Sequence, residues 1–373
     1  YKRQIECGAF DAKAGSTLYL GETDAHPNGF AVLGLGEEKD FTRRVFVQCA
    51  AQAARTFAWA QTQAYAAQEW LPPKTSGKSA ARLFSAAVLN ALTPRATLKG
   101  HHDDGIRTER IFWIDDLVTE KLAQGLEEGS VTAEAMSISR ELADLPGNVC
   151  TPSYLAQAVG NASDGMPAVD VEIFDEHQIE ELGMGAFLSV AKGSAVPPRF
   201  IAIRYRGTNA ALPPVALVGK GITFDAGGIS LKPAANMADM TYDMSGAAVV
   251  IGTVMAAARA KLPINLLGVV AACENLPSGS ASKPGDVVTS LSGKTIEILN
   301  TDCEGRMILA DALTWTARQK PELIIDAATL TGAAVILCSG MMATVATKRT
   351  EAAEKAAKAA AEEAAKLKSD PAA

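Results

Sequence analysis

Hydrophobic and polar positions follow two different periods along this chain, and each period predicts a type of element. Val169, Val171 and Ile173 alternate with acidic residues, which predicts a half-buried strand. Short apolar runs that also predict strands follow at 200–205, 215–218, 264–272 and 323–328. Their spacing leaves room for a helix between successive strands, so the sequence predicts an α/β sheet with mostly parallel neighbours.

A helical period precedes these strands. Five apolar residues recur at intervals of 4, 3, 4 and 3, and Pro146 ends the stripe; they are Val131, Ala135, Ile138, Leu142 and Leu145. The region before it holds shorter runs, such as 31–35 and the alanine-rich stretch 50–67, which predict a small α/β domain. Near the end of the chain, residues 351–368 are rich in alanine with Glu–Lys pairs four apart, which predicts a further helix.

These patterns predict three regions. Residues 1–128 form a small N-terminal α/β domain, 129–146 form a connecting helix, and 147–373 form a catalytic domain whose mixed, mostly parallel sheet is flanked by helices.

Composition narrows the class of protein. The chain has 373 residues, of which 48% are hydrophobic and 21% charged, which is typical of a globular enzyme with a sizeable core. The formal net charge of -7 argues against a nucleic-acid-binding surface. Six cysteines show no C-x-x-C spacing and predict reduced thiols of a cytoplasmic protein. No run of 18 apolar residues is present, so no membrane partner is expected.

Residues that could bind a metal ion or take part in catalysis are most concentrated at 300–306. Asp302, Glu304 and Arg306 occupy alternate positions, so in an extended backbone their side chains would leave on one face and converge. Two carboxylates aimed at one point repel unless a cation lies between them, and Gly305 allows close approach of the chain. This pattern predicts a divalent metal site beside an anion-binding arginine. A solvated acidic loop is the alternative for such a stretch taken alone.

A second polar cluster follows the apolar run 215–218. It contains Lys220, Asp225, Lys232 and Asp243, just beyond a predicted strand, where open α/β sheets place their sites. The phosphate-loop pattern is absent because the lysine precedes the glycines, and the dinucleotide-binding pattern is absent because position 224 is Phe.

The two clusters together resemble the leucyl aminopeptidase family, the cytosolic di-metal exopeptidases. The resemblance rests on residues 219–228 and 300–307, in which Ala226 and Cys303 depart from the usual Ser or Thr and Ala. Segments 144–152, 182–187, 274–279 and 326–332 also look like the family.

The resemblance implies a role for each matching residue. Asp225 and Glu304 would bridge two divalent ions, Zn or Mn first, with Mg or Co as other candidates. Lys232 would be a catalytic donor to the oxyanion, and Arg306 would hold a bicarbonate-like anion. The remaining metal ligands and the substrate-binding residues would be Lys220, Asp243 and Asp302, and Thr329, Leu330 and Gly332, respectively. Asp239 and Glu274 lie off the family's ligand positions and are interpreted as structural.

The function implied by the resemblance is a hydrolase, a metal-dependent aminopeptidase. It would remove N-terminal residues, with leucine or other large apolar residues preferred, by means of a two-metal-activated hydroxide. The family implies peptide substrates and a homohexamer, and it implies a longer C-terminal part, so the catalytic domain is expected to be truncated. Two alternatives stay open: a shortened, catalytically weak relative with a structural or interaction role, and an added DNA-binding role.

Overall fold

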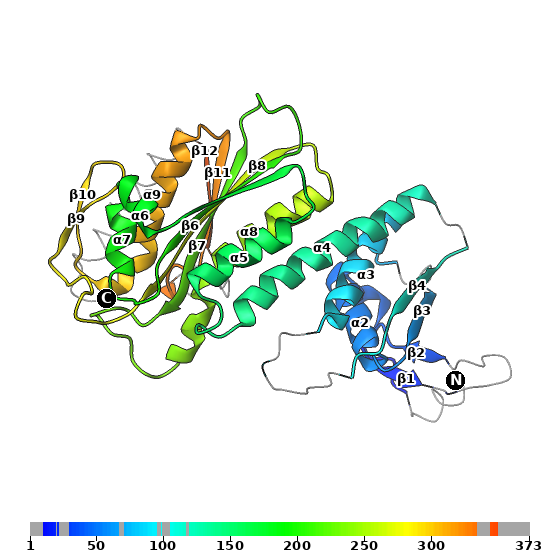
Figure 1. The fold of residues 1–373 in the computed structure, drawn as a ribbon. Helices are drawn as coiled ribbons and strands as arrows, with labels where there is room; N and C mark the ends of the chain where they lie inside the picture. Colours follow the sequence, from blue (N-terminus) through cyan, green and yellow to red (C-terminus); the bar gives the residue numbers. More distant parts are fainter. Residues whose placement is uncertain are drawn as a thin grey trace. The chain divides into compact units, whose positions relative to one another are not determined.

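The structure is a computed structural model that describes residues 10–19, 21, 30–66, 71–94, 98, 105–116, 119–333 and 344–349 (Figure 1). The chain divides into two compact units, Tyr1–Ser137 and Ile138–Ala373. The finer boundaries at 128 and 146 stay a prediction. The predicted helix at 351–368 lies outside the described residues.

The first unit combines short strands with longer helices. Its described elements are β1 (Thr17–Tyr19), β2 (Ala31–Leu33), η1 (Glu38–Asp40), α2 (Arg43–Thr56), β3 (Thr62–Ala66), α3 (Gly77–Leu92), β4 (Arg110–Ile114) and the first part of α4 (Glu120–Asp144). Strands β1 and β2 pair antiparallel, whereas β3 and β4 pair parallel. Phe46 of α2, Tyr65 of β3 and Phe84 of α3 meet in its core.

Helices α2 and α3 of this unit begin where the sequence provides a cap. The side chains of Thr42 and Ser76 accept hydrogen bonds from the amides of Val45 and Ser79, which fixes the first turns of α2 and α3. The alanine-rich stretch 50–67 is helical only to Thr56 and then enters β3, because its alternating Gln63 and Tyr65 are buried on one face of that strand.

The second unit contains a six-stranded sheet. Its elements, after the end of α4, are α5 (Pro152–Ser163), β5 (Val169–Phe174), α6 (Glu176–Glu181), α7 (Gly185–Ala191), β6 (Arg199–Arg206), β7 (Val215–Asp225), η3 (Met237–Met244), α8 (Ser245–Arg259), β8 (Asn265–Asn275), β9 (Val287–Thr289), β10 (Thr295–Glu297), η4 (Thr301–Cys303), α9 (Glu304–Arg318), β11 (Leu323–Ala328) and β12 (Thr344–Arg349). Strands β9 and β10 form a separate antiparallel pair.

The six strands are ordered β12-β11-β7-β8-β6-β5. The central strands β11, β7 and β8 are parallel, and β5 runs the same way, while β6 and β12 run opposite. The predicted mixed, mostly parallel sheet is therefore confirmed. Consecutive parallel strands require a crossover, and α8 supplies it between β7 and β8.

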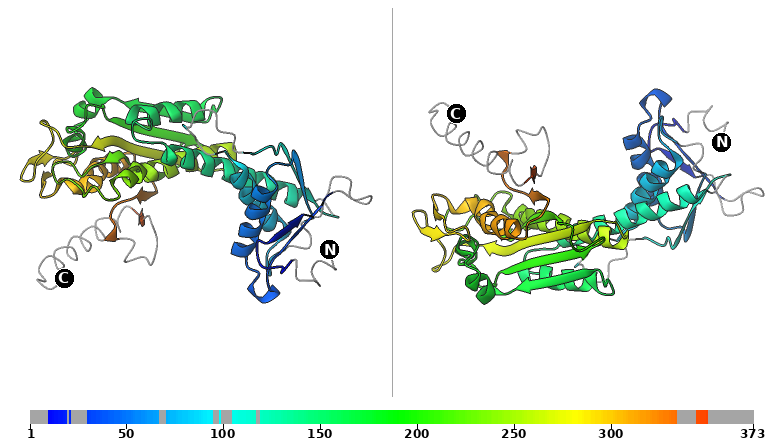
Figure 2. Two further views of the ribbon diagram at one scale, coloured as in Figure 1. Left: turned by 90° about the horizontal axis from the view of Figure 1, so that it is seen from below. Right: turned by 90° about the horizontal axis from the view of Figure 1, so that it is seen from above.

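Helices cover both faces of this sheet, as the two views of Figure 2 show. One apolar cluster packs α7 and α9 against one face, with Phe187, Phe200 and Trp315 among its members. The other packs α5, α8 and the end of α4 against the opposite face, with Leu155 and Met255 among its members. Strand β8 is buried along its whole length because it has helices on both sides.

One stretch, Met237–Arg259, is long and apolar enough to cross a membrane by length and composition. It comprises η3 and the core helix α8, and 61% of its most apolar window is buried inside the protein. Of the four cysteines that the structure describes, three are buried (Cys49, Cys150 and Cys273), and none forms a disulfide.

Candidate metal centre

Strand β7 carries the first two residues of the site. The sequence predicted that the strand would end near Val218, but β7 continues to Asp225. Lys220 therefore lies within the strand rather than in a loop beyond it, and its side chain is only 2% exposed. A buried lysine is tolerated in a central strand because carboxylates surround its ammonium group.

The second segment is helical rather than extended. Residues Thr301–Cys303 form a short 3₁₀ turn, and Glu304 is the first residue of α9. Asp302 and Glu304 still converge, because both lie at the start of the helix. Arg306 is exposed, and in the described part of the chain it forms no ion pair with Asp302 or Glu304. Arg306 therefore does not converge with Asp302 and Glu304, as it would if the backbone were extended.

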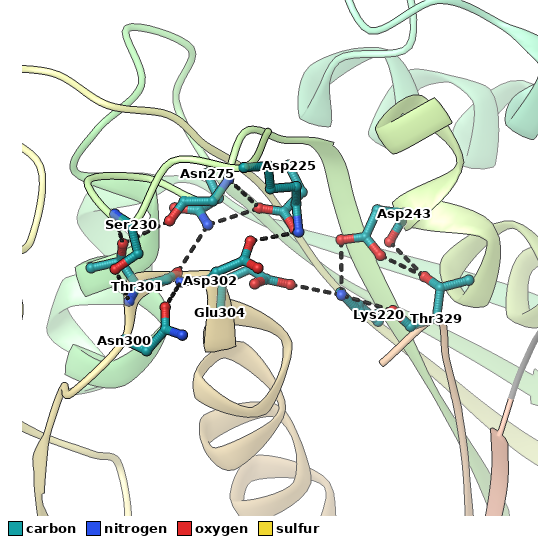
Figure 3. Close-up of polar contacts among 12 residues, drawn as sticks. Lys220, Asp225, Ser230, Asp243, Asn275, Asn300, Thr301, Asp302, Glu304 and Thr329 are labelled. Atoms are coloured by element: carbon teal, nitrogen blue, oxygen red, sulfur yellow. Dashed lines mark hydrogen bonds and ion pairs between the residues drawn. The ribbon is translucent and has the colours of Figure 1, made fainter. Parts of the chain in front are cut away.

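Lys220 joins two carboxylates from different elements (Figure 3). Its Nζ atom lies 2.8 Å from Oδ2 of Asp243, on η3, and 2.7 Å from Oε1 of Glu304. It also donates to the carbonyl oxygen of Thr329 at 3.0 Å. Residues separated by more than a hundred positions thus meet at one ammonium group.

Lys232 makes a matching pair of contacts. Its Nζ atom lies 2.8 Å from Oδ2 of Asp225 and 2.5 Å from Oδ1 of Asp302. Unlike Lys220, its side chain is 20% exposed, so part of it is open to solvent. The site therefore contains one enclosed lysine and one accessible lysine.

Burial and charge shift the pKa values of these groups. Burial is the largest influence on the pKa of Lys220 and lowers it, but Asp243 and Glu304 together outweigh burial and raise the pKa. The pKa of Lys232 is raised in the same way by Asp225 and Asp302. Burial raises the pKa of Asp243 to about 7, which Lys220 opposes and Glu304 reinforces. Burial also raises the pKa of Glu304. A cation bound among the carboxylates would oppose these last two shifts.

Glycines allow the two segments to approach. A Cβ atom on Gly305 would lie 3.0 Å from Cε and Nζ of Lys220, so the end of that lysine fills the space beside the glycine. Gly227 has φ +88°, and a Cβ atom there would lie 2.9 Å from Oδ1 of Asp302. Larger residues at either position would push the segments apart.

Hydrogen bonds from further polar residues hold the carboxylates and the adjoining turn in place. The sequence analysis did not single these residues out. Asn275, at the end of β8, donates from Nδ2 to Oδ1 of Asp225 at 2.8 Å and to the carbonyl of Thr301 at 3.0 Å. Thr301 donates to the carbonyl of Gly227 at 2.6 Å and accepts from the amide of Ser230 at 2.8 Å. The only signal for these residues was their position inside or beside the family-like segments.

The predicted substrate-binding residues border the same cluster to different degrees. Thr329 donates from Oγ1 to Oδ1 of Asp243 at 2.7 Å, in addition to accepting from Lys220. Leu330 is 41% exposed, and its Cδ1 atom lies 3.0 Å from the place of a Cβ atom on Gly305. Among the residues that the structure describes, no heavy atom lies within 4 Å of the place of a Cβ atom on Gly332.

The donor set fits divalent cations. One ligand oxygen from each of Asp225, Asp302 and Glu304 lies within 4.8 Å of the others. Oδ2 of Asp243 and Oδ1 of Asp302 are buried, and among the described residues their partners are the ammonium groups of Lys220 and Lys232. A hard or borderline metal ion could replace an ammonium group as the positive charge beside these oxygens.

The carboxyl edge of this mixed α/β sheet gathers four carboxylates and two lysines, a donor set that suits an enzyme that uses divalent metals. Residues 137–371 match the family described as "Cytosol aminopeptidase family, catalytic domain". The chain belongs to this family, and the predicted enzyme class, a hydrolase of the leucyl aminopeptidase type, is confirmed.

Individual relatives agree with this assignment. A protein of Bordetella pertussis named "Probable cytosol aminopeptidase" is 46% identical over 339 residues, which cover 88% of this chain and 67% of that protein. A protein of Azoarcus with the same name is 42% identical and covers 91% of this chain and 70% of its own length. The solved structure "Bottromycin maturation enzyme BotP in complex with Mn" is 30% identical with a TM-score of 0.81, covering 91% of this chain and 71% of that one.

Proposed function

We propose that this chain is a metal-dependent aminopeptidase that hydrolyses the first peptide bond of peptides with a free N-terminus. The observation that carries the proposal is the convergence of Asp225, Asp302 and Glu304 at one end of the sheet in a member of this family. The names of the relatives support peptides as the substrate class.

The metal ions would be held by the residues that meet in the cluster. The five ligands would be Lys220, Asp225, Asp243, Asp302 and Glu304, holding two divalent ions. Zinc or manganese is proposed first, with magnesium or cobalt as other candidates, and the manganese complex of BotP supports manganese. When bound, two such ions lower the pKa of a shared water and polarise the carbonyl of the bond to be cleaved.

Lys232 would act on the substrate directly. Its raised pKa keeps it an ammonium at neutral pH, and its partial exposure lets an incoming carbonyl oxygen reach it. Asp225 and Asp302 hold the Nζ atom in place before substrate arrives. An ammonium held in advance stabilises the negative charge that develops on the carbonyl oxygen in the transition state.

Two further parts of the site would position the reaction. The exposed guanidinium of Arg306 would hold a bicarbonate-like anion, which suits the planar, bidentate donor pattern of arginine. Thr329, Leu330 and Gly332 would line the substrate end. Exposed apolar side chains at Ile229 and Leu231, in the same loop as Lys232, support a preference for leucine or other large apolar residues.

Family membership alone supports three remaining proposals. The protein would assemble as a homohexamer, act in the cytoplasm and use small peptides. Metal activation and specificity can be measured without knowledge of any of the three.

The decisive experiment is hydrolysis of leucine p-nitroanilide by the purified chain with added Mn²⁺ or Zn²⁺, before and after chelation. Asp302→Ala removes one proposed ligand, and Asp170→Asn removes an exposed carboxylate of β5 as the matched control. Bound metal is counted in parallel by elemental analysis.

We expect hydrolysis that depends on metal, is lost in Asp302→Ala and survives in Asp170→Asn. About two ions per chain with no hydrolysis would contradict the aminopeptidase proposal and favour a relative with a structural role. Hydrolysis that survives chelation would contradict the metal assignment.

A further inference from the structure

A cavity of about 670 Å³ lies in the second unit, on residues that the proposed mechanism does not use. Six of the residues that line it are Asp144, Gly147, Phe224, Tyr242, Glu274 and Leu276. None of the proposed metal ligands, and neither Lys232 nor Arg306, lines it. Its volume lies in the range of cavities that bind small organic molecules.

The charge of the cavity is negative. The residues that line it include two carboxylates, Asp144 and Glu274, and no lysine or arginine. Glu274 is only 7% exposed, and its Oε2 atom accepts a hydrogen bond from Ser194 Oγ at 2.5 Å. Neither acid has a cationic partner among the described residues. A buried carboxylate without a cation is unfavourable, and a cationic ligand would relieve that cost.

The apolar part of the cavity is aromatic. Phe224 and Tyr242 both line it, and the hydroxyl of Tyr242 lies 3.4 Å from Oδ1 of Asp144. Aromatic faces attract organic cations through the ring quadrupole and also pack against flat apolar groups. Carboxylates and aromatic rings together therefore select one ligand class.

The cavity is lined by residues that are adjacent in the sequence to residues of the metal centre. Phe224, Tyr242 and Glu274 each immediately precede a residue of the centre, namely Asp225, Asp243 and Asn275. In a strand, successive side chains point to opposite faces, so β7 directs Phe224 to the cavity and Asp225 to the centre. A ligand in the cavity would contact the residues next to those of the site without entering it.

We propose that this cavity is a second binding site, separate from the metal centre, for a small organic cation that carries a flat apolar group. The ligand's amidinium, guanidinium or ammonium group binds Asp144 and Glu274. Its flat group packs against Phe224 and Tyr242.

Isothermal titration of the whole chain with benzamidine tests the proposal, because benzamidine joins a cation to a flat ring. Benzamide, which has the same shape and no charge, is the matched ligand control. We expect one saturable benzamidine site per chain, with affinity that is the same in metal-loaded and chelated protein. We expect benzamide to bind at least tenfold more weakly.

Two variants locate the binding. Asp144→Asn and Glu274→Gln each keep the shape of the side chain and are expected to weaken benzamidine at least tenfold, whereas Asp164→Asn, an exposed carboxylate after α5, is expected to change nothing. Circular dichroism and a thermal melt confirm folding. If Glu274→Gln fails to fold, the solvent-accessible Asp144→Asn carries the test.

Absence of benzamidine binding would overturn the proposal. So would affinity that Asp144→Asn leaves unchanged, equal binding of benzamide, or competition with leucine p-nitroanilide for one site.

Discussion

Asp311 and the carboxylates of the metal centre, all in the second unit, differ in the groups that their oxygens contact. Asp311, in the middle of α9, is fully buried and accepts from the amide of Leu291 at 2.7 Å on Oδ1 and from the amide of Phe187 at 2.9 Å on Oδ2. In the 3₁₀ turn just before the same helix, Oδ1 of Asp302 accepts from no backbone amide among the described residues and lies 2.5 Å from Nζ of Lys232.

The difference separates a structural acid from a candidate functional one. Both oxygens of Asp311 are taken by the backbone, so this residue joins α9 to α7 and to the segment after β9. Two carboxylates of the metal centre are held on one side, since Asn275 donates to Oδ1 of Asp225 and Thr329 donates to Oδ1 of Asp243, while Oδ2 of each lies beside a lysine ammonium group. A carboxylate oxygen that meets an ammonium group could bind a metal ion in its place.

Among the substitutions that test this difference between structural and functional groups, the replacement of Lys232 is expected to have the largest effect. Replacing it by Met removes the accessible ammonium group while keeping the length of the side chain. We expect kcat for leucine p-nitroanilide to fall by about 10²–10³-fold with KM little changed, because the lost contact strengthens in the transition state. Steady-state kinetics with saturating metal measure both constants. Lys283→Met, on an exposed lysine, is the control, and an equal loss there would contradict the assignment.

Asp311→Asn should affect folding stability rather than activity. The Nδ2 group of an asparagine donates and cannot accept, so one of the two backbone N–H groups now bonded to Asp311 loses its partner. We expect the free energy of unfolding to fall by about 1.5–3 kcal/mol, measured by urea denaturation. The activity per folded molecule should stay within about twofold. A large fall in kcat at full stability would instead place Asp311 in the reaction.

Asn275→Ala should affect metal binding without removing a ligand. The Nδ2 group fixes the orientation of Asp225 and ties β8 to the turn before α9. Outer partners of metal ligands contribute about 10–100-fold in affinity, and we expect a loss of that size in Mn²⁺ titrations. Rescue of activity by excess Mn²⁺ would distinguish this bracing role from a catalytic one. Unchanged affinity would contradict the bracing role.

Asp326, on β11, is an intermediate case, because its Oδ1 atom has no hydrogen bond among the described residues and no lysine pairs with it. Burial raises its pKa to about 6 from the ordinary 3.8. The folded state then binds a proton at Asp326 more tightly than the unfolded state between these pH values, so the contribution of this carboxyl to stability is greatest below pH 4 and is lost as the pH rises through 6.

Asp326→Asn removes that titration. We expect the loss of unfolding free energy between pH 4 and pH 7 to be smaller in the variant by about 1–2 kcal/mol, after discounting for the part of the side chain that reaches solvent. Urea denaturation at both pH values measures this difference. Identical pH dependence in the two proteins would mean that the carboxyl has a partner that removes the effect of burial.

Local patterns predicted much of the fold. The runs at 169–173, 200–205 and 323–328 lie within β5, β6 and β11, because alternation and apolar runs report burial on a sheet directly. The length of β7 could not be predicted this way. Its last residues include Lys220 and two glycines, and they stay in the strand only because distant carboxylates and α8 pack against them.

The candidate site was predicted as a set of residues but not as a geometry. The two motifs identified the acids and lysines that meet, yet the 3₁₀ turn at Thr301–Cys303 replaced the extended backbone expected there. That turn depends on Asn300 and on Ser230, which is 71 residues away from Thr301, and on Asn275. The bond to Asn300 is local, but those with Ser230 and Asn275 are long-range, so no local pattern contains them.

We expect the hydrogen bond between Ser230 and Thr301 to form late in folding. Its partners are 71 residues apart, and β8, which lies between them in the sequence, pairs with β7 in the folded protein. Contacts so distant in the sequence form late in folding, because the intervening chain must first close a long loop. The metal centre is therefore assembled only in a nearly native chain. The rate of metal uptake should therefore report the rate of the last step of folding. Metal ions added early in refolding should leave the rates of the preceding steps unchanged.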